Sequence, residues 1–346
     1  MKSTLENSNK KAGEWLWANF AFAFFVFVLS WYFLPLDDYD RSRHIERYEW
    51  ISDNPIAFWE YFISGEQKDF LFYFLMYLGD FLGLSAGLFI SLVNAITAYV
   101  LIWVFSRFLY GKNDKLLWFF FVLGFSYISL LSGVRFYFGF SLFSLFVYFF
   151  WKNKFFFAVF FLFLAAISHF SFLIFFIAFG FRAFPKFVLP LFCVGIFVAV
   201  ASLAGVFDVD SMVANLNFLS SSDSLGEASK AYAEARGSAH RNLSFYIVNF
   251  WVFIPICFYA LKSKGSDNLS VLLVALVFVM LFYVNNYPVF GRYFLPLLFL
   301  YWCCVAVQKR SPLRGRYVFM LGMAGLVRFL VEFHDHFDVY MKSYFS

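Results

Sequence analysis

The chain has 346 residues, of which 62% are hydrophobic and only 14% are charged. Soluble domains carry about 25% charged and roughly 45–50% apolar residues. This composition therefore excludes a soluble globular protein, a nucleic-acid-binding protein and a disordered chain, and it predicts a membrane protein. The net charge of +5 is spread over short loops, so it informs on topology rather than on a polyanionic partner. The four cysteines lie in apolar stretches without metal-type spacing, which is typical of buried structural thiols.

Apolar stretches long enough to form membrane-spanning helices follow one another along the chain. A helix needs about 20 apolar residues to cross roughly 30 Å of hydrocarbon. The first stretch runs from Trp15 to Pro35, and no small-residue cleavage site of a signal peptide follows it. Further spans are expected at about 86–106, 116–131, 135–151, 187–207, 244–261, 269–284, 291–308 and 316–332.

Basic residues between the spans indicate the orientation, because cytoplasmic loops are enriched in Lys and Arg. Such residues precede the first span and follow the second, the fourth and later spans: Lys2, Lys10, Lys11, Arg107, Lys112, Lys115, Lys152, Lys154, Lys262, Lys264, Lys309, Arg310, Arg314 and Arg316. The N-terminal tail at 1–13 is then cytoplasmic. The first loop at 37–69, the second loop at 208–243 and the C-terminal tail at 333–346 then lie outside, all within a single polytopic membrane domain.

The apolar stretch at 155–181 is interrupted by polar residues around His169. The chain must pass from the cytoplasmic Lys154 to the outer Asp208, and the intervening sequence is too long for one crossing. Three crossings fit if 155–168 and 170–181 are short helices that meet near His169. A polar break at membrane depth is tolerated only where it lines a cavity or is buried in protein. The predicted fold is therefore all-α, with about eleven spans (nine as the lower limit) that include this broken helix pair.

The first outer loop is expected to contain short helices. Asp40 can cap a helix over about 41–62. Its apolar residues are expected to lie on the membrane surface: Ile45, Tyr48, Phe58, Trp59 and Phe62. Residues 70–82 are apolar but short, which predicts an interfacial or re-entrant helix that carries Asp80.

Ionisable residues in apolar spans are candidates for function, because a bilayer makes them costly. Arg135 is either a snorkelling anchor at a helix end or an anion clamp, since guanidinium binds phosphate bidentately. Arg292 follows Pro288 and Gly291 at the outer end of a span, and it is a candidate for the second cation that a diphosphate requires. His169 is either a buried hydrogen-bonding group or a functional imidazole.

Carboxylates gather in the first outer loop. Asp37, Asp38 and Asp40 form either a solvated cap, a general base for a sugar hydroxyl or a site for a divalent cation. Asp80 can serve the same roles from the short apolar helix.

The second outer loop carries a small basic group made of Arg236, His240 and Arg241. These residues are either solvated loop charges or a mobile lid that contacts phosphate or glycan. A capping-box pattern predicts a helix over about 225–236 in this loop.

Two further patterns are discounted. Arg328 and Glu332 have i,i+4 spacing, so an ion pair within one helix explains them. The histidines and aspartates at 334–338 are a weak metal pattern in a terminal tail.

The layout and three short motifs resemble the EpsG-like polysaccharide polymerases, relatives of the Wzy O-antigen and capsule polymerases. The motifs are an Arg at the start of a span (Arg135), Ser-His-Phe-Ser at a helix break (His169) and Arg-Tyr-Phe near the C-terminus (Arg292). The run Asp-Asp-Tyr-Asp at 37–40 also looks like the first-loop acidic motif of GT-C glycosyltransferases.

The resemblance implies a multi-pass glycosyltransferase of the bacterial inner membrane whose active site faces the periplasm or the outside. Such an enzyme transfers the glycan of an undecaprenyl-diphosphate-linked donor to a non-reducing-end hydroxyl of a second lipid-linked repeat unit, and undecaprenyl diphosphate leaves. The implied partners are these two substrates, membrane lipid, a chain-length regulator and a flippase. No cofactor and no metal are expected, because arginines replace the cation.

The resemblance also implies roles for the candidate residues. Preorganised cations can stabilise the leaving diphosphate, and the candidates are Arg135, Arg292, Arg236 and Arg241. A buried neutral imidazole suits a base at neutral pH, and the candidates for catalysis are His169, Asp40 and Asp38. Contacts with the glycan or the lipid are expected from Tyr137, Tyr287, Tyr293, Asp80 and His240.

Three other functions stay open. A lipid-linked oligosaccharide flippase predicts two homologous halves, and the sequence has no evident internal repeat. An O-acyltransferase also uses an intramembrane His, but its acyl donor is normally cytosolic, whereas the charged clusters here lie in the outer loops. A ligase shares the donor chemistry and predicts the same residues.

Overall fold

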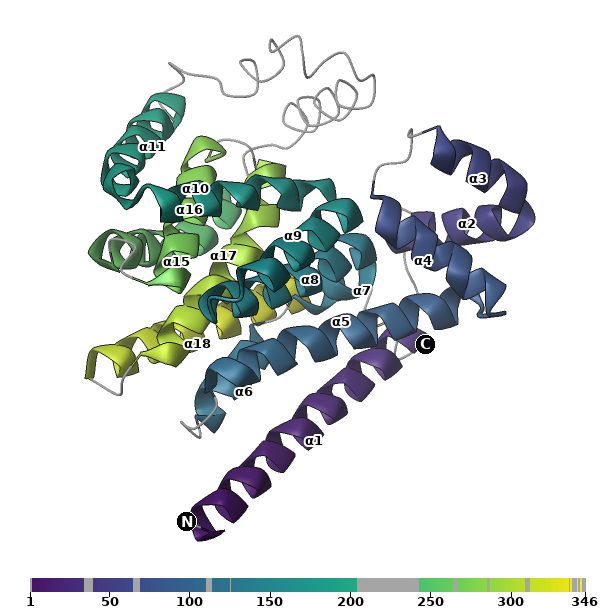
Figure 1. Ribbon diagram of the computed structural model, residues 1–346, viewed down its shortest axis with the longest axis horizontal. Coiled ribbons are helices and arrows are strands. Elements are labelled where there is room, and N and C mark those ends of the chain that lie inside the picture. The colour runs from purple at the N-terminus through teal and green to yellow at the C-terminus, as the bar shows by residue number, and fades with distance from the viewer. Residues whose placement is uncertain are drawn as a thin grey trace. The chain divides into compact units, whose positions relative to one another are not determined.

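A computed structural model describes residues 2–33, 40–64, 69–109, 114–124, 126–203, 243–263, 267–284, 287–308, 312–335, 337, 341 and 343. Within these ranges every regular element is a helix and none is a strand, which confirms the predicted all-α class (Figure 1). The chain divides into two compact units, Met1–Ile174 with Val305–Ser346 and Phe175–Cys304.

Three helices of the first unit are long and apolar enough to cross a membrane. They are α1 (Lys2–Tyr32), whose apolar part is Trp15–Tyr32, α5 (Ala86–Leu109) and α8 (Val134–Trp151). The other apolar helices in the described residues are shorter, so the count of about eleven spans stays a prediction. Helix α1 begins at Lys2, so residues 2–13, expected as a tail, continue the first helix.

The first unit contains seven further helices in the described residues: α2 (Asp40–Asp53), α3 (Pro55–Ile63), α4 (Phe70–Phe81), α6 (Lys115–Leu123), α7 (Tyr127–Ser132), α9 (Phe155–Ser168) and α18 (Pro312–Asp335). Helix α5 packs against α1 and α8, and α8 packs against α9 (Figure 1). Helix α18 packs against α6.

The second unit is built around a buried helix. Its elements are α10 (Ile177–Ala183), η2 (Pro185–Phe187), α11 (Val188–Leu203), α15 (Leu243–Ser263), α16 (Asn268–Phe282) and most of α17 (Tyr287–Val307), while η1 (Phe170–Phe176) leads into it. Helices α10, α11 and α15 all pack against α16. A capping box at Asp267 starts α16, because the Asp267 carboxylate accepts hydrogen bonds from the amides of Leu269 and Ser270.

Two elements expected as single helices are divided in the structure. The helix expected over 41–62 becomes α2 and α3, because Pro55 follows Asn54 and disfavours helical geometry there. The helix expected over 116–131 becomes α6 and α7, which are separated at Gly124. A Cβ on Gly325 would lie only 3.2 Å from the Cα of Gly124, so the backbones approach closely where α6 meets α18.

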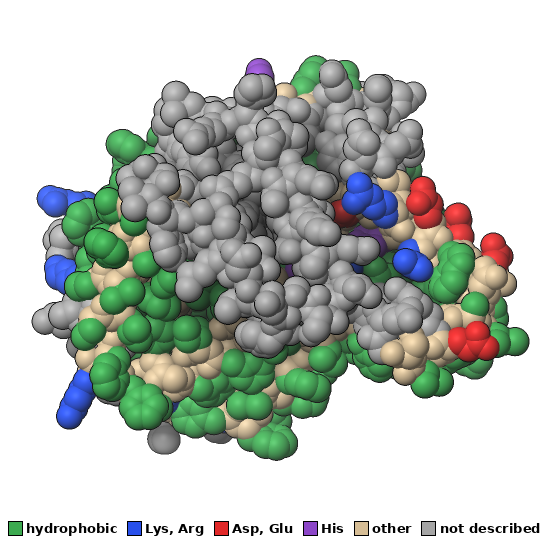
Figure 2. Space-filling view, turned by 90° about the horizontal axis from the view of Figure 1, so that it is seen from above, with side chains coloured by type: hydrophobic (Ala, Val, Ile, Leu, Met, Phe, Trp, Pro, Cys, Tyr) green, Lys and Arg blue, Asp and Glu red, His purple; other side chains and the backbone are tan. Residues whose placement is uncertain are grey.

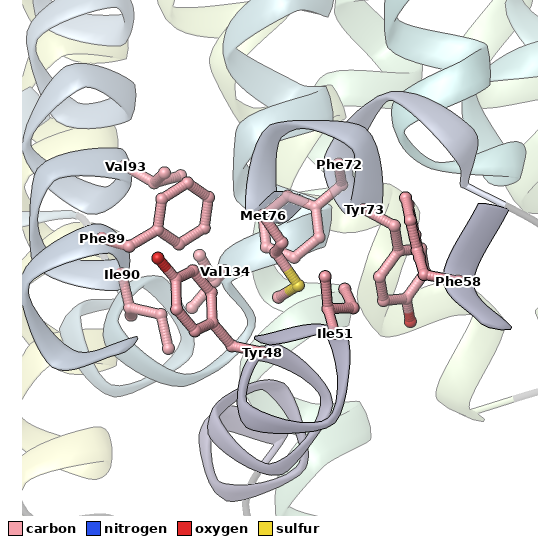
Figure 3. Close-up of a cluster of buried hydrophobic side chains, with 10 residues drawn as sticks. All are labelled: Tyr48, Ile51, Phe58, Phe72, Tyr73, Met76, Phe89, Ile90, Val93 and Val134. Carbon is pink, nitrogen blue, oxygen red and sulfur yellow. The ribbon is translucent and has the colours of Figure 1, made fainter. Parts of the chain in front are cut away.

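The segment 40–64, expected as part of the first outer loop, is folded onto the helices around it. Its core cluster consists of Tyr48, Ile51, Phe58, Phe72, Tyr73, Met76, Phe89, Ile90, Val93 and Val134 (Figure 3). The expectation that Tyr48 and Phe58 lie on the membrane surface is wrong, since they are only 3% and 2% exposed. Their rings pack inside the cluster, and the Tyr48 hydroxyl also donates to the carbonyl of Leu84 at 2.7 Å. This packing gives α2 and α4 fixed positions beside α5 and α8.

A buried arginine anchors the start of α2. The Arg41 guanidinium donates to the Ser30 hydroxyl at 2.9 Å, to the Ser30 carbonyl at 2.8 Å and to the Leu131 carbonyl at 3.5 Å. The Asn94 amide donates to the Ser30 hydroxyl at 3.0 Å and to the Leu131 carbonyl at 3.4 Å. Both carbonyls belong to the last turns of α1 and α7, where the helix dipole favours a cation. Arg41 therefore connects the start of α2 to the ends of two helices.

Candidate functional site

The centre of the candidate site is an ion pair at the start of α8. Arg135 Nη1 lies 2.8 Å from the Oδ2 of Asp69, and it also donates to the Tyr73 hydroxyl at 3.3 Å. The Asp69 side chain is 8% exposed and that of Arg135 is 31% exposed. Within the described residues, Nη2 and Nε of Arg135 make no hydrogen bond. The N–H groups on Nη2 and Nε can therefore donate hydrogen bonds to a ligand.

Asp69 joins this pair to the helix break that the sequence predicts. Its second carboxylate oxygen accepts a 2.8 Å hydrogen bond from the backbone N–H of Phe170. Asp69 itself has left-handed backbone geometry (φ 61°, ψ 40°), which Asp tolerates better than most residues. The carboxylate thus connects the start of α4 with Arg135 and with the residue that follows His169.

His169 lies at the predicted break. Helix α9 ends at Ser168, His169 is extended (φ −155°, ψ 113°), and η1 follows. The imidazole Nδ1 lies 2.7 Å from the Ser171 hydroxyl, and the ring meets the Phe136 ring edge-on at a centroid distance of 5.3 Å. His169 is 8% exposed. The break is therefore a defined turn inside the protein, as expected, and it is continued by a 3-10 helix.

A glycine on α8 makes room for this turn. A Cβ on Gly139 would lie 2.9 Å from the Phe172 ring and 3.2 Å from the Cβ of His169. Any larger residue at Gly139 would therefore push the His169 turn away from α8.

Helix α2 brings further charges to the same region. The Arg47 guanidinium lies over the rings of Trp50 and Tyr73, at 5.2 and 5.9 Å from their centroids. Asp40 and Arg43 form an exposed pair at 3.6 Å. Figure 2 shows acidic, basic and histidine side chains next to one another on the right of the view, beside hydrophobic surface.

His44 is a buried imidazole on α2. Its ring packs 5.2 Å from the ring of Phe72. Burial, with Arg135 and Arg43 acting in the same direction and Asp40 against it, lowers the pKa of His44 from 6.5 to about 4. His44 is therefore neutral at physiological pH and adds no positive charge beside Arg135.

The other candidates in the described residues lie in different surroundings. Asp80, on α4, is partly buried, and burial together with this carboxylate raises the pKa of Tyr48 to about 12. Tyr137 is 2% exposed and its ring packs against Phe136 and Phe140. Tyr293 belongs to the second unit and is 8% exposed.

Several candidates lie outside what the structure describes. Residues 34–39 and 204–242 are outside the described ranges, and they hold Asp37, Asp38, Arg236, His240 and Arg241 as well as the helix expected at 225–236. Arg292 and Tyr287 lie on α17, and their side chains are outside the described part of the structure. In the described part of the chain, no group of three or more His, Cys, Asp or Glu side chains is arranged to hold a metal ion.

The structure adds four residues that sequence reasoning missed. Asp69, Tyr73, His44 and Arg47 all surround Arg135 or its partners. Asp69 lies 101 positions before Phe170 in the chain, so no local pattern links the two. The i,i+4 spacing of Arg43 and Arg47 on an expected helix was the one available signal for a basic face.

Comparison with known proteins agrees with the resemblance seen in the sequence. The sequence model of the EpsG family matches residues 14–346, nearly the whole chain. No curated protein and no solved structure matches the chain. The apolar helices and this match indicate a membrane protein with a function of the polysaccharide-polymerase type, which is glycosyltransferase-like in general character. The chain therefore belongs to the EpsG family.

Proposed function

We propose that the chain is a polymerase of lipid-linked oligosaccharide repeat units at the outer face of the bacterial inner membrane. It transfers the glycan of an undecaprenyl-diphosphate-linked donor to a non-reducing-end hydroxyl of an acceptor unit. The family match over nearly the whole chain supports the class of reaction.

One observation carries the assignment of the site. Arg135 lies at a helix start, is partly exposed, and holds Asp69 with only one of its nitrogens. The diphosphate gains charge as the glycosidic bond breaks, and a preorganised guanidinium stabilises that charge through planar, bidentate hydrogen bonds. Arg135 is thus the residue that we assign to the leaving diphosphate.

The transfer proceeds in this proposal as a single displacement with inversion. The acceptor hydroxyl oxygen attacks the anomeric carbon, the bond from that carbon to the diphosphate oxygen breaks, and the hydroxyl proton passes to a base. His169 is the candidate base with a described environment, because its imidazole is held by Ser171 at a fixed turn. Asp40 and Asp38 are the alternative bases.

Further contacts complete the proposal. Arg292, Arg236 and Arg241 assist with the diphosphate, and Tyr137, Tyr287, Tyr293, Asp80 and His240 contact the glycan or the prenyl chain. No metal takes part, and a chain-length regulator and a flippase are the protein partners.

The direct test is polymerisation by the purified protein in liposomes that contain the lipid-linked single repeat unit as the only glycan. The proposal predicts a ladder of products that differ by one repeat unit, together with release of undecaprenyl diphosphate. Movement of intact units across the bilayer without bond formation would show a flippase. Absence of repeat-unit joining, with glycan transfer only when an unrelated acceptor is added in a second assay, would show a ligase, and either result would overturn the proposal.

A further inference from the structure

We propose that Asp69 is the resident counter-ion of a diphosphate site formed by Arg135 and Arg47, and that the incoming diphosphate displaces its carboxylate from Arg135. The identity of the ligand rests on the proposed function. The displacement itself is a property of the described side chains, and it can be tested by binding alone.

The donor geometry of Arg135 leaves room for a ligand. Nη1 serves both Asp69 and Tyr73, while Nη2 and Nε have no partner in the described residues. The Arg135 side chain is 31% exposed, so an anion can reach it from solvent. A phosphate group that binds the free edge approaches the Asp69 carboxylate, and the two anions repel one another. Binding and the ion pair therefore compete.

The local charge balance favours an anion of higher charge than a carboxylate. Arg47 lies over the face of Tyr73, and the hydroxyl of the same tyrosine accepts from Arg135. No carboxylate of the described residues lies within ion-pair distance of Arg47. Two guanidinium groups thus contact one tyrosine, only that of Arg135 is paired with Asp69, and the neighbouring His44 is neutral at physiological pH. A diphosphate, with at least two negative charges, matches both cations.

Displacement of Asp69 also reaches the His169 turn. The same carboxylate accepts the Phe170 N–H at 2.8 Å, directly after His169. Arg135 holds the Asp69 carboxylate in the position where it accepts from Phe170. When the carboxylate leaves Arg135, the hydrogen bond from Phe170 is therefore expected to weaken. Diphosphate binding is thereby expected to loosen the backbone on which the candidate base sits.

In a second ion pair of the same unit, an aspartate also accepts from a backbone N–H with one oxygen and pairs with an arginine through the other, but a ligand cannot reach this arginine. The Oδ1 of Asp114 accepts the Leu117 N–H at 3.1 Å, and its Oδ2 lies 2.7 Å from Nη2 of Arg314. The Arg314 side chain is only 6% exposed, and its Nε donates to the Val305 carbonyl at 3.1 Å. Asp114→Asn is therefore a matched control for Asp69→Asn.

The experiment measures binding of inorganic diphosphate and of farnesyl diphosphate to the purified full chain at constant ionic strength. Asn at position 69 keeps the left-handed geometry and the acceptor for Phe170, but it removes the competing charge. We expect Asp69→Asn to bind diphosphate about 10-fold more tightly, Asp114→Asn to bind like the wild type, and Arg47→Gln to bind more weakly. Unchanged or weaker binding by Asp69→Asn, or binding of neither diphosphate to the wild type, would overturn the proposal.

A measurement on the wild type keeps the test independent of variant folding. Saturating inorganic diphosphate is expected to increase hydrogen exchange of the backbone amides in 169–172, since Phe170 loses its fixed acceptor. Unchanged or slower exchange there would contradict the displacement. A protein that passes both tests but makes no polymer would refute the proposed function alone, and a polymerase that fails them would refute the counter-ion role alone.

Discussion

Replacing Arg135 by Lys separates the charge of this residue from its geometry. A lysine keeps the positive charge and has the reach to pair with Asp69, which lies 2.8 Å from the arginine Nη1. It lacks the planar fork, because its donors sit on a single nitrogen. Even after Asp69 is displaced, a lysine therefore cannot give the diphosphate the two parallel hydrogen bonds of a guanidinium in the transition state.

The size of the effect follows from the donors that are lost. A hydrogen bond to a charged group contributes about 1.5–3 kcal/mol. Loss of one such bond to the leaving diphosphate lowers the rate by about 10- to 100-fold. The ion pair with Asp69 survives the change, so the free energy of unfolding is expected to change much less than the rate.

The assay is the initial rate of chain elongation by the purified variant in liposomes that contain lipid-linked repeat units. Arg107→Lys is the control, since Arg107 is exposed at the end of α5 and lies 4.7 Å from the Trp103 ring. The control is expected to keep the wild-type rate. An Arg135→Lys rate within about twofold of the wild type would refute the assignment of Arg135 as the diphosphate clamp.

Three more predictions address stability and the turn at His169. The pKa of His44 is lowered from 6.5 to about 4 in the folded protein, so the unfolded chain binds this proton more readily. The free energy of unfolding is therefore expected to fall by about 3 kcal/mol as the pH falls from about 6.5 to 4. In His44→Gln the free energy of unfolding should depend less on pH across this range, and an unchanged dependence would contradict the role of His44. Arg314→Met removes the buried cation that pairs with the partly buried Asp114 carboxylate and should cost about 3 kcal/mol in unfolding experiments. A cost below about 1 kcal/mol would contradict this. Gly139→Ala places a methyl group against the Phe172 ring and should lower the free energy of unfolding by about 1–3 kcal/mol. Chain elongation should slow, because the His169 turn moves. A wild-type elongation rate would show that the position of this turn does not matter.

The sequence predicts the long helices well for a physical reason. Continuous apolar stretches near 20 residues admit few structures other than a spanning helix, and α1, α5 and α8 correspond to such stretches. The break at His169 was also predicted, because the basic residues on one side and the acidic loop on the other require a turn in 155–181.

Tertiary packing explains what the sequence did not reveal. Tyr48 and Phe58 lie on apolar faces of α2 and α3, and such a face suits a membrane surface as well as a protein core until the packing partners are known. Pro55 was a local signal that the helix expected over 41–62 divides at Asn54, but the apolar pattern of this segment favoured one continuous helix. Asp69 has no local signal, because its partners Arg135 and Phe170 come from other helices.

The most direct test of the central claim is the length of the surface polysaccharide in a deletion strain complemented with the wild type, His169→Ala or Arg135→Ala. Proteins present at equal levels are compared by gel electrophoresis of the glycan. The polymerase account predicts that wild type restores long chains, while each variant delivers only single repeat units to the cell surface. Loss of all surface glycan, with lipid-linked units accumulating on the cytoplasmic side, would show transport instead and would contradict the account.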